Sequence, residues 1–363
     1  MSPHKKGLIA LICTVVLLAG ALLVLHLLTE QDPEPANAES QPDTEANDAL
    51  SSYLVDWNNK RYRKNYNVET LLLIGYDKDV PLSELELKGY QDGGCADFLL
   101  LVVIDHGKEE IRMCQLDRDT MTPIHTLSEL GGRPQGTKVL NIALSHCYGK
   151  DLAACDRNTV TAVLDLMDHA WVDRTISMNI AGIPAINHLL GGVEMVIPED
   201  LTDLIGMELP EELGSVESEE TRVLTAGNTV KLTDRQAVLV TRARMQVGDG
   251  RNVSRMARQK EFMKAAAKQM QAMVAQDSSF ASTLVDGVAD IATMDMSQGW
   301  IVNTLVNTYN YTVRDPYIPA STHTSRLVYR TSLNEPYEIE ECYVDEEDLT
   351  RWVMENLYVE YGT

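Results

Sequence analysis

Three strand-like runs with a continuous apolar character are the strongest constraint that the sequence places on the fold. They cover residues 68–77, 96–105 and 109–117, and they lack the regular polar alternation of a strand with one face in water. Strands that are apolar at successive positions are typical of sheets covered on both faces. The second and third runs are separated by "HGK", where Gly107 suits a tight hairpin turn. The sequence therefore predicts a layered domain whose central sheet contains this hairpin.

Acidic residues stand where the hairpin strands begin and end. Asp97 precedes Lys108 by eleven residues, and Asp119 follows it by eleven. Folding the chain about Gly107 places Asp97 opposite either Arg118 or Asp119, and a one-residue slip in register decides between them. Two facing carboxylates repel each other unless a cation lies between them, which here means Arg118 or a bound Mg²⁺. The alternative is a salt bridge that only closes the end of a strand.

Helical and extended patterns alternate along the rest of the chain. Helical spacing covers residues 158–170 and 254–276, and "TDRQ" at residues 233–236 is a capping box that begins a short helix. Residues 175–180 have the pattern of a strand. Strands that alternate with helices indicate an α/β fold, here an α-β-α sandwich. Near the C-terminus a further strand and a closing helix are predicted, without any sign of chemistry.

Positive charge is concentrated in one segment of an acidic chain. The net charge is −23 at pH 7, which argues against a nucleic-acid partner. The segment "RARMQVGDGRNVSRMARQK" nevertheless carries six basic side chains and a single acidic one. Arg242 and Arg244 are predicted to share one face of a strand, and Arg255 and Arg258 one face of a helix together with Gln259. Guanidinium groups at fixed positions suit phosphate. The alternative is a solvated basic helix face.

The N-terminus predicts attachment to a membrane. Residues 7–28 are almost entirely apolar and, at about 1.5 Å per residue, long enough to cross a bilayer core of about 30 Å. Two lysines precede this run and acidic residues follow it, so the positive-inside rule leaves residues 1–6 in the cytoplasm. The acidic, Pro- and Ala-rich residues 29–50 predict a flexible stalk, and residues 51–363 would form an extracellular domain. The alternative is a signal peptide cleaved near residues 36–38.

Five cysteines follow the apolar run, and no two of them have the CxxC spacing of a metal-binding finger. Cys147 and Cys155 flank seven residues that we interpret as a short loop in an oxidising compartment. These two cysteines are therefore predicted to form a disulfide, because a short loop costs little to close. The alternative is two independent thiols.

Taken together, these features resemble the LytR-CpsA-Psr family of cell-envelope proteins, whose domain is also described as the cell envelope-related transcriptional attenuator domain. The resemblance spans about residues 68–270, and it implies an α/β fold with a central mixed sheet and a C-terminal extension over residues 277–363. The order and spacing of the landmarks carry it more than any one motif. They are "LLLIGYDKD" (71–79), "ADFLLLVVID" (96–105), "LDRDTM" (116–121), "LNIALSHCYG" (140–149), "LLGGVEMVIPED" (189–200), "LTDRQAVLVTRAR" (232–244) and "SRMARQ" (254–259).

The resemblance implies an activity and a set of site residues. The family is understood to transfer anionic glycopolymers from a polyprenyl-pyrophosphate carrier to peptidoglycan at the cell membrane, with Mg²⁺ at the pyrophosphate. By this resemblance Asp97 and Asp119 would hold Mg²⁺, and with Arg118 they would be the catalytic residues. The residues implied to bind the pyrophosphate are Arg242, Arg244, Arg255, Arg258 and Gln259.

Two places depart from the family pattern. Cys95 and Ala96 replace a usual arginine and serine, and Asn252 stands where an aspartate is common. Both hairpin carboxylates are retained, which favours catalysis, because binding alone would not need them. The alternative is a non-catalytic module that binds polyprenyl phosphate or regulates the cell envelope.

Overall fold

The computed structural model describes residues 54–362, apart from 79–81, 205–217, 245–246, 248–249 and 330–335. The chain from Leu54 onward forms one unit. The predicted membrane span and stalk lie outside the described residues. Within the described part of the chain, no helix is both long enough and apolar enough to cross a membrane.

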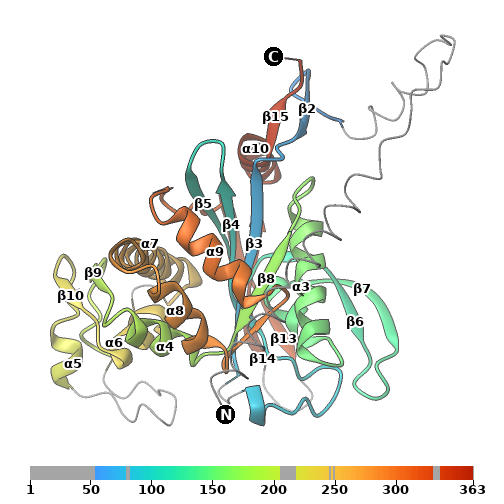
Figure 1. The fold of residues 1–363 in the computed structure, drawn as a ribbon. Coiled ribbons are helices and arrows are strands. Elements are labelled where there is room, and N and C mark those ends of the chain that lie inside the picture. Colours follow the sequence, from blue (N-terminus) through green and yellow to red (C-terminus); the bar gives the residue numbers. More distant parts are fainter. Residues whose placement is uncertain are drawn as a thin grey trace, which may run out of the picture. The chain divides into compact units, whose positions relative to one another are not determined.

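A six-stranded sheet lies at the centre of this unit (Figure 1). Parallel pairing joins β3 to β8 and β5 to β12, while the other neighbours are antiparallel, so the sheet is mixed, as predicted. Its strands, in spatial order, are β11 (Ala292–Met294), β8 (Arg174–Met178), β3 (Val68–Tyr76), β4 (Ala96–Asp105), β5 (Glu110–Leu116) and β12 (Thr312–Val313).

The hairpin of β4 and β5 has a defined register. Leu99 pairs with Leu116, and this register, continued to the strand ends, aligns Asp97 with Arg118 and not with Asp119. The buried Asp105 carboxylate fixes the turn by accepting hydrogen bonds of 3.0 Å from the backbone N–H groups of Gly107 and Lys108. The turn therefore decides between the two registers that the sequence allows.

Helices cover both faces of the sheet, as the sandwich predicts (Figure 1). On one face, α3 (Leu152–Leu166) and α10 (Glu346–Leu357) contribute to a core with alternate residues of the strands, including Leu99 and Leu101. On the other face lies α7 (Asn252–Gln276), where Gln259 Oε1 accepts a 2.8 Å hydrogen bond from Gln115 of β5. Beside α7 lie α8 (Phe280–Val288) and α9 (Gln298–Thr308).

A second core forms beside the sheet and includes part of α7. Its elements are α4 (Gly182–Leu189), β9 (Glu194–Val196), β10 (Thr229–Lys231) and α6 (Asp234–Arg242). The predicted capping box is present at the start of α6, where Thr233 and Gln236 satisfy each other's backbone N–H groups. The predicted strand for Arg242 and Arg244 is wrong, because α6 continues through Arg242.

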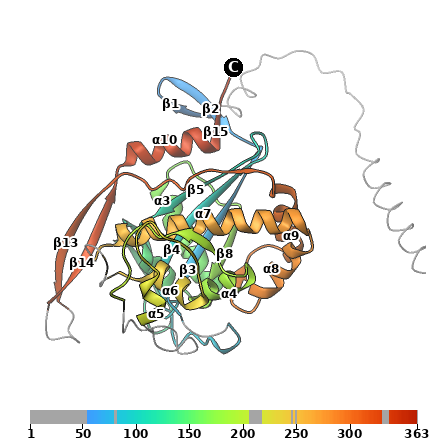
Figure 2. The ribbon, with the colours of Figure 1, turned by 90° about the vertical axis from the view of Figure 1, so that its left-hand side faces the viewer.

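The other elements surround this framework. The predicted C-terminal strand and helix are confirmed as β14 and α10, and β14 pairs with β13 in a hairpin that projects from the domain (Figure 2). The elements whose bounds have not yet been given are β1 (Leu54–Trp57), β2 (Lys60–Lys64), η1 (Leu82–Glu84), β6 (Met121–Leu127), β7 (Pro134–Asn141), η2 (Ile142–Cys147), α5 (Ser218–Arg222), β13 (Ser321–Tyr329), β14 (Pro336–Val344) and β15 (Tyr358–Glu360).

Candidate functional site

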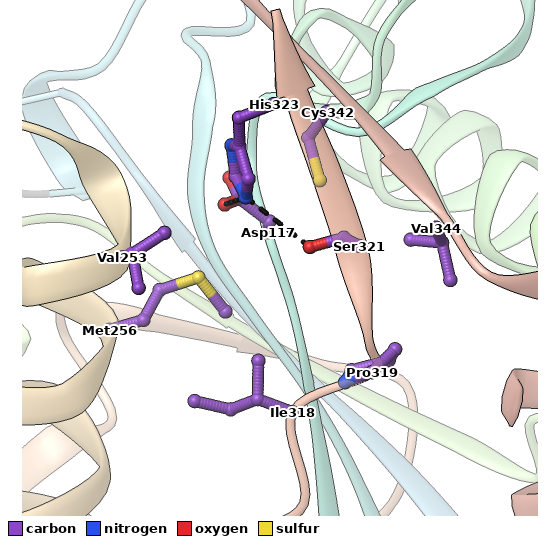
Figure 3. A pocket seen from close by; sticks show the side chains of 9 residues that line it. All are labelled: Asp117, Val253, Met256, Ile318, Pro319, Ser321, His323, Cys342 and Val344. Carbon is purple, nitrogen blue, oxygen red and sulfur yellow. Dashed lines mark hydrogen bonds and ion pairs between the residues drawn. The ribbon is translucent and has the colours of Figure 1, made fainter.

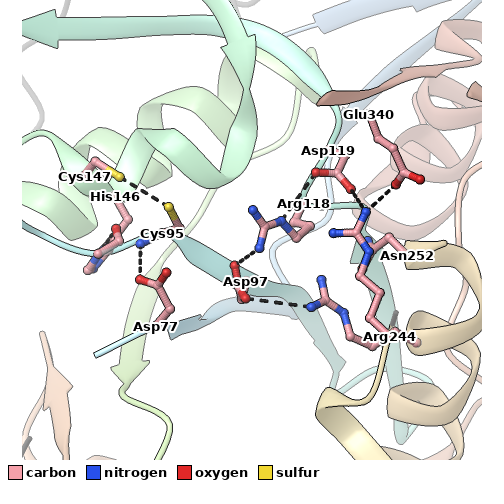
Figure 4. Close-up of polar contacts among 12 residues, drawn as sticks. Asp77, Cys95, Asp97, Arg118, Asp119, His146, Cys147, Arg244, Asn252 and Glu340 are labelled. Carbon is pink, nitrogen blue, oxygen red and sulfur yellow. Dashed lines mark hydrogen bonds and ion pairs between the residues drawn. The ribbon is translucent and has the colours of Figure 1, made fainter. Parts of the chain in front are cut away.

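The hairpin of β4 and β5 brings two carboxylates together at its open end, away from the turn. Asp97 lies at the start of β4, and Arg118 and Asp119 follow the end of β5, so antiparallel pairing makes them neighbours. The Arg118 guanidinium forms an ion pair with Asp97, and its Nε lies 3.4 Å from Asp119 Oδ1 (Figure 4). Arg118 therefore lies between the two carboxylates.

Two further arginines reach the same place from the other half of the domain. Arg244, just after α6, places Nη2 3.5 Å from Asp119 Oδ2 and also pairs with Glu340 of β14. Arg255, in the first turns of α7, places Nη1 3.8 Å from Asp97 Oδ2. We call these residues the arginine–carboxylate cluster: Asp97, Arg118, Asp119, Arg244, Arg255 and Glu340.

The guanidinium groups of the cluster have hydrogen-bonding capacity that the described residues do not use. The Nε atoms of Arg118 and Arg244, and both Nε and Nη2 of Arg255, are buried and have no hydrogen-bond partner among the described residues. Buried donors are normally partnered, and each one left unpaired costs about 1–3 kcal/mol. An anion with several oxygen atoms would supply the missing acceptors, so the arrangement suits phosphate.

Burial perturbs the protonation of the cluster. Burial lowers the pKa of Arg255 to about 10, against the raising effect of Asp97, so this guanidinium is still charged at neutral pH. Burial also lowers the pKa of Arg118, but Asp97 and Asp119 outweigh it and the net pKa is raised. Burial raises the pKa of Asp119, while Arg118 opposes this change. The buried positive charges therefore depend on nearby negative charge.

Backbone and amide contacts hold the segment that carries Arg118 and Asp119. The Asp117 Oδ1 atom accepts hydrogen bonds from the backbone N–H of Asp119 at 2.9 Å and from Asn252 Nδ2 at 2.6 Å. An aspartate at position 252 would have no side-chain N–H to donate to Asp117. Asn141 Nδ2 donates to the carbonyl oxygens of Asp119 at 3.1 Å and of Glu340 at 2.8 Å. These amides fix the cluster in place.

Three predicted pyrophosphate-binding residues are placed differently. Arg258 is fully buried and donates to the carbonyls of Val240 and Ala243 while pairing with Glu199, which uses all three of its nitrogens. Gln259 bridges β5 and α6 through Gln115 and the carbonyl of Thr241. Arg242 is half-buried at the last turn of α6, and no contact to the cluster is recorded for it among the described residues.

The predicted disulfide between Cys147 and Cys155 is not present, and all five cysteines of the described part of the chain are free thiols. The intervening residues are not a simple loop, because α3 begins at Leu152 and buries Cys155 in its first turn. The Cys147 Sγ instead lies 3.6 Å from the Sγ of Cys95, beside the cluster (Figure 4).

Asp97 and Asp119 also have the donor chemistry that Mg²⁺ requires. Both supply only oxygen atoms, and Mg²⁺ in proteins is often held by one or two carboxylates together with substrate phosphate. Both carboxylates also face guanidinium groups, which can pair with the phosphate that such an ion would share. The donor set therefore fits Mg²⁺ bound jointly with phosphate.

Glu340 was missed from the sequence, where its segment showed no sign of chemistry. It lies on β14, ninety-six residues after Arg244, and no local motif links the two. Asp117 belongs to the landmark "LDRDTM", and its carboxylate positions Asp119. The alternation of β14 would have shown which residues share a face, but not that this face meets Arg244.

The fold is a mixed α/β domain, and the arginine–carboxylate cluster lies where β4 begins and β5 ends. The chain belongs to the LytR_cpsA_psr family, whose model matches residues 31–314 and includes the span of the landmarks. Members of this family are generally cell-wall glycopolymer transferases. No curated protein matches the chain.

Solved structures share the fold at low sequence identity. Protein gbs0355 from Streptococcus agalactiae is 17% identical with a TM-score of 0.57, and the match covers 80% of this chain and 88% of that one. TagV from B. subtilis is 15% identical with a TM-score of 0.55, and the match covers 81% and 98%. TagT bound to LI-WTA is 16% identical with a TM-score of 0.55, and the match covers 80% and 91%.

Proposed function

We propose that this chain transfers an anionic glycopolymer from a polyprenyl-pyrophosphate carrier to peptidoglycan. The observation that carries the proposal is the set of buried N–H groups on Arg118, Arg244 and Arg255 that make no hydrogen bond to the described residues. A pyrophosphate has enough oxygen acceptors to meet all of them at once. The family supports the transferase role, and a wall teichoic acid ligand on TagT supports a glycopolymer as the substrate.

In the proposed transfer reaction, the charged groups of the cluster bind the donor and accept a proton. An acceptor hydroxyl oxygen attacks the sugar-side phosphorus, and the bond from this phosphorus to the bridging oxygen breaks. The electron pair of that bond leaves with polyprenyl phosphate, and a carboxylate of the cluster receives the hydroxyl proton. Guanidinium donors stabilise the charge that develops on the bridging oxygen, each by about 3 kcal/mol. The arginines thus bind the donor and assist its departure.

Mg²⁺ belongs to the same proposal, with Asp97 and Asp119 as its ligands. When bound, it would offset charge on the pyrophosphate. Arg118 forms ion pairs with the same two carboxylates. If these carboxylates held Mg²⁺, the guanidinium of Arg118 would be released to pair with phosphate oxygens.

A transfer assay tests the proposal with the full chain, a lipid-linked glycopolymer, peptidoglycan and Mg²⁺. The wild-type chain should transfer polymer and release polyprenyl phosphate. Asp119→Ala should slow transfer by at least about a hundredfold, as expected for loss of an acid–base or metal-binding carboxylate. The matched control is Asp165→Ala, which removes an exposed aspartate of α3 and should leave the rate unchanged.

The rival proposal is a binding module, which would retain the lipid-linked donor unchanged. Transfer by Asp119→Ala at the wild-type rate would show that the charges are structural. Circular dichroism should show a folded variant, because Arg118 retains Asp97 and Arg244 retains Glu340 after the substitution.

We also propose that residues 7–28 anchor the chain in the cell membrane, with the domain outside. The length of the apolar run and the charges that flank it support this placement. Protease added to intact cells should then degrade the domain, and a mature N-terminus near Glu39 would contradict the anchor.

A further inference from the structure

A second group of chemically reactive side chains lies close to the arginine–carboxylate cluster, where the β13–β14 hairpin meets the end of β5. His323 of β13 and Cys342 of β14 are direct cross-strand partners, so their side chains share one face of the hairpin. Asp117 faces them from the segment after β5 (Figure 3). One ligand atom from each of the three residues lies within 4.8 Å of the others.

These three side chains line a cavity of about 220 Å³. Apolar residues form much of the remaining wall, among them Val253 and Met256 of α7 and Ile318 before β13 (Figure 3). Cys342 is fully buried, and the imidazole of His323 is largely buried. A site with polar groups on one side and apolar walls on the other limits access of water to a bound ion.

One oxygen of Asp117 supplies an independent indication of a ligand. Asp117 is 94% buried, and its Oδ1 atom is fully used by Asn252 and the backbone of Asp119. Its Oδ2 atom has no hydrogen-bond partner among the described residues and lies 3.9 Å from His323 Nε2, too far for a hydrogen bond. A buried carboxylate oxygen without a partner is costly unless a cation binds it.

We propose that Asp117, His323 and Cys342 bind one Zn²⁺ ion. Carboxylate, imidazole and thiolate are together the ligand types of zinc sites, whereas Mg²⁺ and Ca²⁺ prefer oxygen alone. Zinc bonds of about 2.0–2.3 Å require the three ligand atoms to approach each other by roughly 1 Å, and binding through His323 Nε2 would replace its 3.2 Å contact with Ser321 Oγ. The thiol proton of Cys342 leaves to solvent on binding.

Such an ion would join the C-terminal hairpin to the segment that carries Asp119. The backbone N–H of Cys342 already donates to the Asp119 carbonyl at 2.8 Å, and Thr120 forms a β-bridge with Cys342. Zinc would add side-chain bonds to these backbone bonds. It therefore acts as a positioning element for Asp119 and Glu340, and its binding does not depend on the transferase reaction.

The test is a metal titration of the full chain, prepared without an affinity tag and stripped with a chelator. Competition against a chromophoric chelator should show one tightly bound Zn²⁺ per chain, and Mg²⁺ should not displace it. Co²⁺ in place of Zn²⁺ should give the charge-transfer absorption of a thiolate ligand. Loss of one ligand, in His323→Ala or Cys342→Ala, should weaken Zn²⁺ binding by at least roughly 10- to 100-fold. This is the loss expected when only a residue that supports a metal ligand is removed.

Matched control variants are available. His125→Ala removes an exposed histidine of β6, and Cys147→Ala removes a cysteine that lies away from the cavity, so neither should change the affinity. Unchanged affinity in both ligand variants, absence of tight Zn²⁺ binding, or a Co²⁺ complex without thiolate absorption would each overturn the proposal. The Co²⁺ spectrum of the wild-type chain keeps the test decisive even if Cys342→Ala fails to fold.

Discussion

Arg255 and Arg258 lie one turn apart on α7 and are both buried, yet their surroundings differ. Arg258 donates to two carbonyl groups near the end of α6 and pairs with Glu199, so all its nitrogens are used within the fold. Arg255 has one ion-pair contact, at 3.8 Å, and two nitrogens without a partner among the described residues. Arg258 therefore stabilises the fold, whereas we propose that Arg255 binds a ligand.

This difference predicts opposite effects of the same substitution. Arg255→Met removes a buried cation that lacks adequate partners, and it should raise the free energy of unfolding of the ligand-free chain by on the order of 1 kcal/mol. Arg258→Met leaves Glu199 and the two carbonyls without their donor, and it should lower the free energy of unfolding by about 3 kcal/mol. Urea denaturation measures both, and a change of the same sign in the two variants would contradict these assignments.

At this scale the sequence predicted the pairing of Asp97 with Arg118 or Asp119, because eleven residues on each side of a turn is a local count. It did not separate Arg255 from Arg258, because both fit the same helix face. The separation depends on carbonyls of α6 and on Glu199, which folding brings to Arg258 from outside the helix.

Among the elements, α6 links local sequence signals to the site. Its capping box begins the helix at Asp234, and its end at Arg242 places Arg244 beside Asp119. The capping box was readable because its residues are three positions apart. The segment "VLVTRAR" has the apolar, β-branched composition of a strand, and only packing in the second core makes its first part helical.

The capping box should contribute measurably to stability. Thr233→Ala removes the side-chain oxygen that accepts a hydrogen bond from the backbone of Gln236, and it should lower the free energy of unfolding by about 1 kcal/mol. Thr161→Ala is the control, because the Thr161 hydroxyl bonds only to a carbonyl within α3 and its loss should cost less than about 0.5 kcal/mol. Equal effects in denaturant titrations would show that the cap does not stabilise α6.

In the whole molecule, the site is built from segments that are distant in sequence. The sequence predicted a covered sheet and its helices, since apolar runs and helical spacing are local patterns, whereas the mixed character of the sheet was implied by the family resemblance. It did not predict that the β13–β14 hairpin returns to the end of β5, because that contact joins Cys342 to Asp119 through backbone atoms. The same return brings Glu340 to the arginine–carboxylate cluster and His323 to the proposed zinc site, so local patterns could not reveal either residue.

The central claim is that the guanidinium groups of Arg118, Arg244 and Arg255 form a pyrophosphate site. Calorimetric titration of the full chain with farnesyl pyrophosphate, a short polyprenyl pyrophosphate, in the presence of Mg²⁺ tests this claim most directly. The wild-type chain should bind the ligand, and Arg255→Ala should bind it more weakly by about 1.5–3 kcal/mol, roughly 10- to 150-fold.

Arg314→Ala provides the matched control, because it removes the same charge from an exposed residue that pairs with Glu110 at the opposite end of β5. The account predicts that this variant binds farnesyl pyrophosphate as the wild-type chain does. Equal affinity in Arg255→Ala and the wild-type chain, or equal losses in Arg255→Ala and Arg314→Ala, would contradict it.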